Sequence, residues 1–585
     1  MGEVERVEVA RGNVALASAA GNSSSCAPRG ILRTMTHRLR RPLRTLAVLL
    51  PGLAAILPAQ SPIRVLESRE RPALVVLLTI DQMRPEYLER WHEQMKGGLR
   101  RLVDQGAFYR NGFQDHANTE TAPGHASTLS GRFPYSTGIA SNSAGVNTSA
   151  APLIGSEGTG ASPFRFRGST LVDWMTSSDE RTRVLSISRK DRGAILPVGR
   201  GKHPVYWYAP ASGRFVTSTY YADALPSWVE GFNAEERVVK RYAGKSWTLL
   251  MPGYEYPEPD ESPGELRSQE PLFPHEMPTD AMRANNLVMT FPYMDELTLD
   301  FAWRGVRAMN LGAGPQTDIL AVSLSTLDAI GHRWGPDSRE VHDHVLRLDR
   351  MLGQFLDSLT ALRGADKIVL ALTSDHGVAP IPETRSTFDD NRKAMRVMME
   401  AFDPAIAVLA TRTAKAGIPA EAFSFDGDVL TLDRAKVPSG KLVMVPGIAV
   451  AFAKAAKRVK GVQRTDLIDR LATVDTVKDD IARRLLHMYR PGGETLVAVT
   501  LTPYSYRGNS GSATHGSPHD YDARVPIIFW GAPFTPGRRP EKARVVDIAP
   551  TLAEVIGVRP LEKLDGVSLK TIIKPEARSS LPVPR

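Results

Sequence analysis

ALVVLLTIDQM, at residues 73–83, is the stretch that decides the fold of this 585-residue chain. It is a run of apolar and β-branched residues that ends near a carboxylate, Asp81, and it predicts a strand buried on both faces. The amphipathic residues 85–106 follow it directly and predict a helix. A buried strand followed by a helix is the repeating unit of a parallel sheet covered by helices.

The same pattern recurs along the chain. Residues 317–328 predict a second strand, which leads through a loop containing Gly, His and Trp into a long helix over residues 338–362. Residues 366–377 and 525–531 predict further strands, and residues 547–556 predict a helix that packs on the sheet. We therefore predict an α/β fold in which helices sandwich a mostly parallel sheet, with functional residues at the carboxyl ends of the strands.

Two long stretches, residues 150–290 and 385–510, break this pattern and are predicted to be inserted cap or lid regions. The first includes the aromatic-rich WYAPASGRFVTSTYY. Such an insertion beside the active edge of a sheet forms either a lid over substrate or a structural elaboration, and the sequence leaves both open. The core is then assembled from three pieces, residues 61–149, 291–384 and 511–585.

Residues 1–60 have the composition of a leader. They contain eight Arg and three Glu, and so account for five of the nine net positive charges. The remaining surplus is too mild to indicate a nucleic-acid partner. After Met35, a basic stretch and the apolar residues 45–57 predict a signal peptide at about residues 35–59. We expect export to the periplasm or out of the cell, without a stable membrane span, because the apolar run is short and interrupted by Pro51 and Gly52.

Residues 1–34 are polar and rich in small side chains, and Met1 and Met35 are both candidate starts. The single cysteine, Cys26, lies in this segment and lacks the apolar run that should precede a lipidated cysteine. We therefore expect no disulfide in the exported part. The sequence is compatible with a monomer but does not fix the oligomeric state.

NTETAPGHAS, at residues 118–127, places Thr121 before a proline and a run of small residues. Pro123 suits the first turn of a helix, so Thr121 is expected beside a helix N-terminus. The unpaired N–H groups and helix dipole there favour an anion, either an alkoxide or an attached phosphate. The alternative is that Thr121 is an N-cap residue, a position that threonine favours.

Carboxylates and imidazoles stand at the ends of the predicted strands or directly after them. Any one of them alone is typical of a capping or structural residue. Together they place Asp and His at the edge where an α/β sheet keeps its chemistry, and this mixed set of ligands suits zinc better than magnesium or calcium. The residues are Asp81, Asp328, His332, Asp375, His376 and His515.

The ordered motifs D, TAPGH, N, KxR, DxxxH, DHG and THG resemble the alkaline phosphatase superfamily, above all its threonine-nucleophile, PafA-like branch. The resemblance spans roughly residues 73–560 and implies an alkaline-phosphatase-like core holding two zinc ions. It implies that Asp328, His332 and His515 hold one zinc. It implies that Asp81, Asp375 and His376 hold the other, with the Thr121 oxygen as a further ligand.

A phosphomonoesterase is the function that this resemblance implies. Coordination would make the hydroxyl of Thr121 an effective nucleophile, which would attack phosphorus in line and form a phosphothreonine intermediate. Lys190 and Arg192 lie in SRKDRGAI and share a strand face if this segment is extended. Two cations favour the terminal phosphate of a small-molecule monoester, and the resemblance adds Asn142 as a third contact with the phosphoryl group.

Other members of the superfamily give alternatives. A nucleotide pyrophosphatase or phosphodiesterase shares the threonine and both ligand sets, but normally lacks the Lys-x-Arg pair. A sulfatase needs a cysteine or serine in place of Thr121, and a phosphonoacetate-type hydrolase is a weaker option. A non-catalytic phosphate-binding protein would be expected to have lost a ligand or the nucleophile.

Three further histidines match no ligand position. His519 is expected at the surface or beside the site, and His116 and His125 are expected to pack or form hydrogen bonds.

Overall fold

The computed structural model describes residues 71–260, 272–384, 394–508 and 512–578. The predicted leader, the signal peptide and Cys26 lie outside these residues. Within them, an eleven-stranded sheet forms the core, and its centre is β1 (Leu74–Ile80) between β9 (Asp318–Leu324) and β10 (Ile368–Thr373), all three parallel. β4 (Val184–Ser188) and β5 (Val205–Ala209) extend this parallel block beyond β9.

The two sides of the sheet depart from the parallel pattern. β17 (Arg524–Trp530) runs antiparallel to both β10 and β2 (Ala107–Phe113). The remaining strands of this sheet lie at its margins. They are β3 (Leu153–Ile154) and β6 (Arg214–Ser218) beyond β5, and β18 (Gly537–Arg539) and β19 (Ala543–Arg544) beside β2. The predicted α/β class with a mostly parallel sheet is confirmed.

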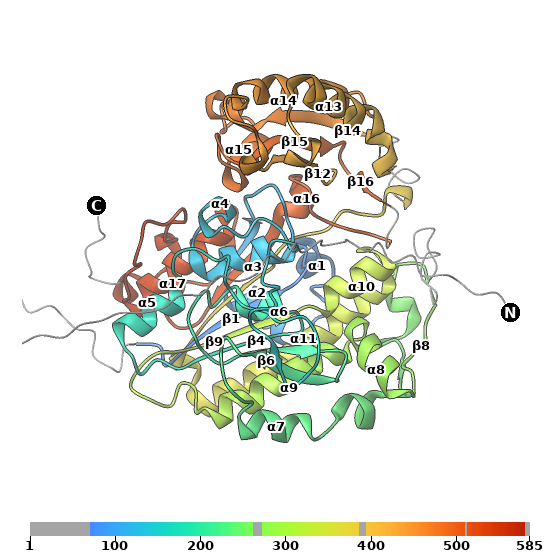
Figure 1. Cartoon of the computed structure of the whole chain (residues 1–585). Coiled ribbons are helices and arrows are strands. Elements are labelled where there is room, and N and C mark those ends of the chain that lie inside the picture. The colour runs from blue at the N-terminus through green and yellow to red at the C-terminus, as the bar shows by residue number, and fades with distance from the viewer. Residues whose placement is uncertain (1–70, 261–271, 385–393, 509–511, 579–585) are drawn as a thin grey trace, which may run out of the picture. The chain divides into compact units, whose positions relative to one another are not determined.

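Alternate residues of β1 divide between two apolar cores. Leu74, Val76 and Leu78 pack in one core with residues of α9 (Tyr293–Ala308) and α11 (Arg339–Arg363). Val75 and Leu77 pack in the other with residues of α3 (Thr121–Ser130), α5 (Leu171–Ser178) and α17 (Ile548–Ile556). A strand buried on both faces must have helices on both sides, and α3 and α9 lie on opposite sides of it in Figure 1.

The helix predicted over residues 85–106 is two helices, α1 (Pro85–Arg90) and α2 (Gly98–Gln105). The break follows from a contact with α11, where a carboxylate oxygen of Asp349 accepts hydrogen bonds from the backbone N–H groups of Lys96 and Gly97. A Cβ on Gly97 would lie 2.2 Å from the Asp349 carbonyl oxygen, so only glycine allows this approach.

The loop predicted after residues 317–328 is also a helix, α10 (Thr326–Trp334). It begins where Asp295 on α9 accepts hydrogen bonds from the backbone N–H and the hydroxyl of Thr326. Asp328 therefore lies in the first turn of α10, with His332 one turn later.

The segment 150–290 contributes β3, β4, β5 and β6 to the main sheet, so much of it is part of the core rather than an appendage. The helices α7 (Ser227–Asn233) and α8 (Ala281–Leu287) follow these strands.

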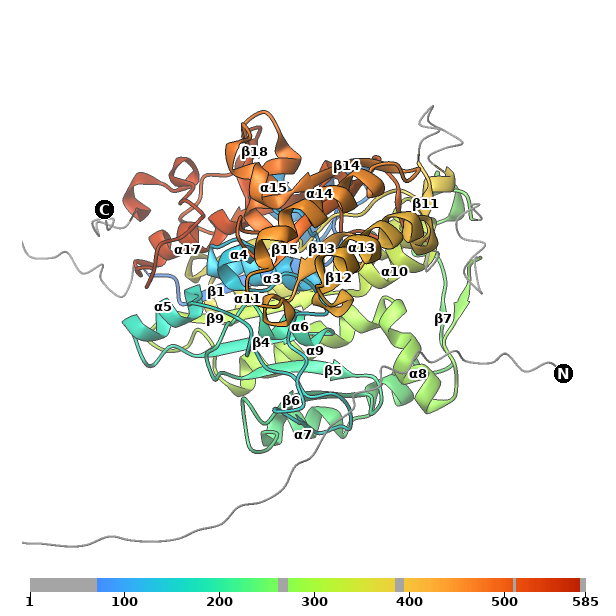
Figure 2. The ribbon, with the colours of Figure 1, turned by 45° about the horizontal axis from the view of Figure 1, so that its top comes forward.

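The described part of the segment 385–510 instead forms a second sheet with an apolar core of its own. Its strands, in spatial order, are β12 (Phe423–Phe425), β13 (Val429–Leu432), β15 (Thr495–Leu501) and β14 (Val462–Leu467). Helices α13 (Asp403–Ala416) and α14 (Val445–Ala456) lie side by side across it (Figure 2). On α15 (Asp480–Met488), Arg483 pairs at 3.0 Å with Asp115 of the core. In the described part of the chain, no helix combines the length and apolarity that crossing a bilayer requires.

Candidate active site

Thr121 is the first residue of α3 and is almost completely buried. Glu120 occupies the N-cap position, so the alternative in which Thr121 caps the helix is wrong. The Ala122 backbone N–H donates to the side-chain oxygen of Asn142 at 2.9 Å. The hydroxyl of Thr121 accepts a hydrogen bond from the Lys190 ammonium at 3.2 Å. The local sequence thus places a hydroxyl at the positive end of a helix dipole, beside a cation.

Asp328, His332 and His515 form one carboxylate–imidazole group. Their ligand atoms lie within 4.8 Å of one another, and Nε2 of His332 and of His515 lie 3.2 and 3.6 Å from Asp328 Oδ1. Nδ1 of His332 contacts the Ala513 carbonyl oxygen, and Nδ1 of His515 contacts that of Thr119, each at 2.8 Å. A carbonyl contact at Nδ1 fixes the tautomer and leaves Nε2 free to act as a metal ligand.

Asp81, Asp375 and His376 lie on the Thr121 side of the site. His376 Nε2 is 3.2 Å from Asp375 Oδ2 and 3.9 Å from Asp328 Oδ1, so this imidazole lies between the two groups. Its Nδ1 contacts the carbonyl oxygen of Gly377 at 2.9 Å. Asp81 and Asp375 lie at the ends of the adjacent parallel strands β1 and β10, and this brings residues far apart in the sequence together.

His125 lies closer to these carboxylates than the sequence predicts. Its ring nitrogens are each 3.5 Å from an oxygen of Asp81 or Asp375, and the three residues form the second compact set of ligand atoms. Both ring nitrogens nevertheless have closer partners, the Thr121 carbonyl and the Ser323 hydroxyl, each at 3.0 Å. Nε2 of His376 instead contacts the carboxylates of Asp375 and Asp328, which are themselves candidate ligands, so it is the better candidate ligand.

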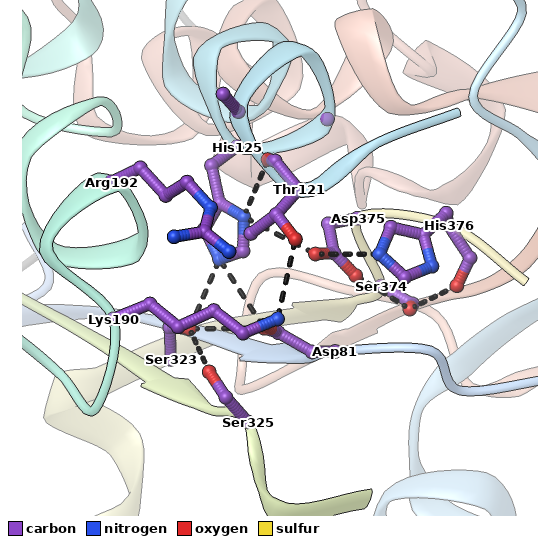
Figure 3. Close-up of polar contacts among 12 residues, drawn as sticks. Asp81, Thr121, His125, Lys190, Arg192, Ser323, Ser325, Ser374, Asp375 and His376 are labelled. Carbon is purple, nitrogen blue, oxygen red and sulfur yellow. Dashed lines mark hydrogen bonds and ion pairs between the residues drawn. The ribbon is translucent and has the colours of Figure 1, made fainter. Parts of the chain in front are cut away.

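Lys190 and Arg192 approach Thr121 from another direction (Figure 3). They do not share a strand face, because β4 ends at Ser188 and α6 (Asp191–Ile195) begins one residue after Lys190. The Ser188 hydroxyl accepts from the Lys190 backbone N–H at this turn. The Lys190 ammonium lies 3.0 Å from Asp81 and 2.7 Å from Asp328, and the Arg192 guanidinium points toward the same space.

Electrostatics keep this site ionised although it is buried. Burial disfavours the carboxylate of Asp328, but Lys190 and His332 outweigh burial and hold its pKa well below the usual range. Burial opposes ionisation of Asp375 too, yet His376 lowers its pKa strongly. Burial lowers the pKa of His376, but the carboxylates of Asp375 and Asp328 outweigh burial and raise this pKa to about 9. Neighbouring positive groups therefore keep Asp328 and Asp375 in the carboxylate form, which is the form that binds a metal ion.

The other two histidines have structural surroundings. His519 is buried, and its Nε2 contacts the Leu501 carbonyl oxygen at 2.9 Å, so of its two expected positions, at the surface or beside the site, the surface is wrong. His116 is fully buried, and neither ring nitrogen has a partner among the described residues. Burial lowers the pKa of His116 to about 3, and the ring packs as a neutral group.

Sequence reasoning missed two residues of the site. The Ser323 hydroxyl on β9 lies 3.0 Å from each of Asp81 Oδ1, His125 Nε2 and the Ser188 hydroxyl. Glu120 accepts a 2.6 Å hydrogen bond from the Asn142 backbone N–H. The sequence held a signal for each residue. Ser323 stands near the end of an otherwise apolar strand, and Glu120 is a carboxylate next to the candidate nucleophile.

The comparisons with known proteins agree with this geometry. A family model described as type I phosphodiesterase / nucleotide pyrophosphatase matches residues 75–441. The chain is 31% identical over 524 residues to a protein named "Calcium-transporting ATPase" from Myroides odoratus, covering 84% of this chain and 93% of that one. It is 30% identical over 509 residues to alkaline phosphatase PhoV from Synechococcus elongatus, covering 84% and 90%.

A solved structure of wild-type alkaline phosphatase PafA superposes with a TM-score of 0.76 at 26% identity, covering 86% of this chain and 99% of that one. An α/β core with carboxylates and imidazoles gathered around a threonine at its strand ends defines an enzyme of the alkaline phosphatase superfamily. Within that superfamily, the chain belongs to the type I phosphodiesterase / nucleotide pyrophosphatase family, and over most of its length it is a PafA-like alkaline phosphatase.

Proposed function

We propose that this protein is a zinc-dependent phosphate monoesterase in which Thr121 attacks phosphorus and carries the phosphoryl group as phosphothreonine. One observation carries the proposal. The Lys190 ammonium contacts the Thr121 hydroxyl and one carboxylate from each ligand group, Asp81 and Asp328. The nucleophile, both ligand groups and a cation able to bind phosphate thus converge on one point.

Two zinc ions fit the residues around that point. Asp375 Oδ2 and His376 Nε2 are fully buried and lie 3.2 Å apart, so two candidate ligand atoms of this group face each other. The donors are mixed oxygen and imidazole nitrogen, which suits zinc. One ion would be held by Asp328, His332 and His515, and the other by Asp81, Asp375, His376 and Thr121. When bound, the ions would lower the pKa of the Thr121 hydroxyl and stabilise charge on the leaving oxygen.

The remaining groups bind and orient the phosphate. The first turn of α3 directs backbone N–H groups and its dipole toward negative charge at Thr121. The Ala122 N–H fixes the amide oxygen of Asn142, so the amide nitrogen is left to donate to a phosphoryl oxygen. Lys190 and Arg192 supply two positive charges, which match the dianion of a monoester better than the single charge of a diester.

A variant of PafA supports these roles. Its solved structure carries replacements of a threonine, an asparagine, a lysine and an arginine. In that protein the threonine and asparagine are 21 positions apart, and the lysine and arginine are two apart. Thr121 and Asn142, and Lys190 and Arg192, have the same spacings. We also propose, from the leader sequence alone, that the enzyme acts in the periplasm or outside the cell.

The family model keeps a nucleotide pyrophosphatase or phosphodiesterase as the second candidate. The decisive experiment compares an aryl phosphate with the matched methyl aryl phosphate diester on wild type and on the double variant Lys190→Ala/Arg192→Ala. We expect a strong monoester preference that the variant largely loses, by about tenfold to a hundredfold for each charged hydrogen bond. Lys478→Ala is the control, because its side chain is 85% exposed. A wild-type preference for the diester would establish the second candidate.

A further inference from the structure

A cavity of about 140 Å³ lies beside the first ligand group. Its walls combine His515 and Glu120 from the core with Asp428, Thr500 and Arg507 from the segment 385–510. His515 belongs to the group that does not include Thr121. In an in-line displacement the leaving oxygen departs opposite the nucleophile, and in the proposed function that is the His515 side. The cavity therefore lies where the alcohol of the substrate would be.

The side chains that line this cavity offer both hydrogen-bond donors and acceptors. Arg507 is the one guanidinium among them, and its Nη2 pairs with Asp428. Asp522 Oδ2 accepts from the backbone N–H and hydroxyl of Ser517 at 2.9 and 2.6 Å. A hydroxyl group both donates and accepts, so an alcohol with further hydroxyls matches this polar lining.

The charge and size of the cavity narrow the class further. Glu120, Asp428 and Asp522 supply three carboxylates against the single guanidinium of Arg507, so a second anionic group on the alcohol is disfavoured. A cavity of about 150 Å³ is known to hold a benzene molecule, so this volume suits an alcohol of about six non-hydrogen atoms, the size of a three-carbon polyol.

We propose that this cavity is the leaving-group pocket and selects phosphate monoesters of small, uncharged polyols, with Arg507 as the specificity-determining residue. The proposal rests on the proposed function. It assigns the segment 385–510 a direct part in substrate choice, because Arg507 and Asp428 both come from it.

Three monoesters with three-carbon alcohols test the proposal: glycerol phosphate, propyl phosphate and phosphoglycerate. The variant Arg507→Met removes the donors and keeps the length of the side chain. It leaves Asp428 solvated, because that side chain is 62% exposed. We expect wild type to favour glycerol phosphate over propyl phosphate in kcat/KM by about tenfold, the scale of one well-made hydrogen bond. Arg507→Met should bring that ratio close to one, chiefly by lowering kcat/KM for glycerol phosphate.

Arg458→Met is the matched control, since Arg458 is an exposed arginine of the same segment. Asp428→Asn leaves the Arg507 charge uncompensated, and should raise kcat/KM for phosphoglycerate relative to glycerol phosphate severalfold. An unchanged glycerol-to-propyl ratio in Arg507→Met would overturn the proposal while the monoesterase function stands. Failure of wild type to hydrolyse any of the three esters would overturn the pocket proposal, and failure to hydrolyse an aryl phosphate as well would overturn the proposed function.

Discussion

Gly124→Ala is the most informative single substitution in this enzyme. Gly124 lies one turn into α3, where the helix passes the end of β10. A Cβ at this position would lie 2.2 Å from the carbonyl oxygen of Asp375 and 2.8 Å from its Cα. These are backbone atoms, so no side-chain rotation relieves the contact. The added methyl group would force the candidate nucleophile and a candidate zinc ligand apart.

The size of the effect follows from that clearance. Ordinary van der Waals contact begins at 3.4 Å, so α3 and Asp375 must separate by more than about 1 Å. Overpacking of this kind costs about 1–3 kcal/mol of stability. A displacement of about 1 Å within a catalytic group reduces turnover about a hundredfold. We therefore expect Gly124→Ala to remain folded but to lose about two orders of magnitude in kcat, with weaker retention of zinc.

The assay is steady-state hydrolysis of an aryl phosphate, combined with zinc content by mass spectrometry and thermal unfolding. Gly231→Ala is the control, because Gly231 lies in α7 and a Cβ there would meet no described atom within 4 Å. Alanine is favoured over glycine inside a helix by about 0.5–1 kcal/mol, so this control should be fully active and no less stable. Near-wild-type activity and zinc content in Gly124→Ala would refute the claim that Gly124 sets the distance between Thr121 and Asp375.

Two further predictions concern the nucleophile and a remote buried carboxylate. Thr121→Ala should lower turnover by at least about 10³-fold while the unfolding temperature and most of the bound zinc are kept; substantial residual activity would remove Thr121 from the mechanism. Burial raises the pKa of Glu340 to about 8, so folding takes up a proton between about pH 4.5 and 8, and stability should fall as pH rises through this window. Glu340→Gln should reduce the slope of the free energy of unfolding against pH by at most about 1.4 kcal/mol per pH unit. Urea unfolding at several pH values measures this slope. An unchanged slope in the variant would show that another group causes the decline in stability.

The sequence predicts the central strands well because their signal is local. Residues 73–83 and 366–377 each contain a nearly continuous apolar run, and the structure places β1 and β10 within these stretches. The same alternation of strands and helices predicts which edge collects the polar residues. The predicted ligands meet there because parallel strands end on the same side of a sheet.

The errors arise where a distant residue decides local structure. The break between α1 and α2 depends on Asp349, more than 240 positions away, and the start of α10 depends on Asp295. Neither partner can be identified from the local pattern. The turn after β4 likewise depends on the hydroxyl of Ser188, which accepts from the Lys190 backbone and converts the expected extended pair into a helix start. Lys190 and Arg192 are expected from the sequence to reach the same point from one face of a strand. They do not share a strand, but both side chains approach Thr121, so they can still act together.

The proposed catalytic residues and the residues of the proposed alcohol pocket come from different parts of the chain. Asp81 and Asp375 are fixed at the ends of paired central strands, and Thr121 at the start of a buried helix, so small movements there disturb chemistry on every substrate. Arg507 and Asp428 belong to the segment with its own sheet and its own apolar core. Substitutions in that segment can reshape the proposed alcohol pocket without repacking the main core. Substrate preference and catalytic power should therefore vary independently, with changes at Arg507 altering the ratio between esters and changes at Gly124 lowering the rate for all of them.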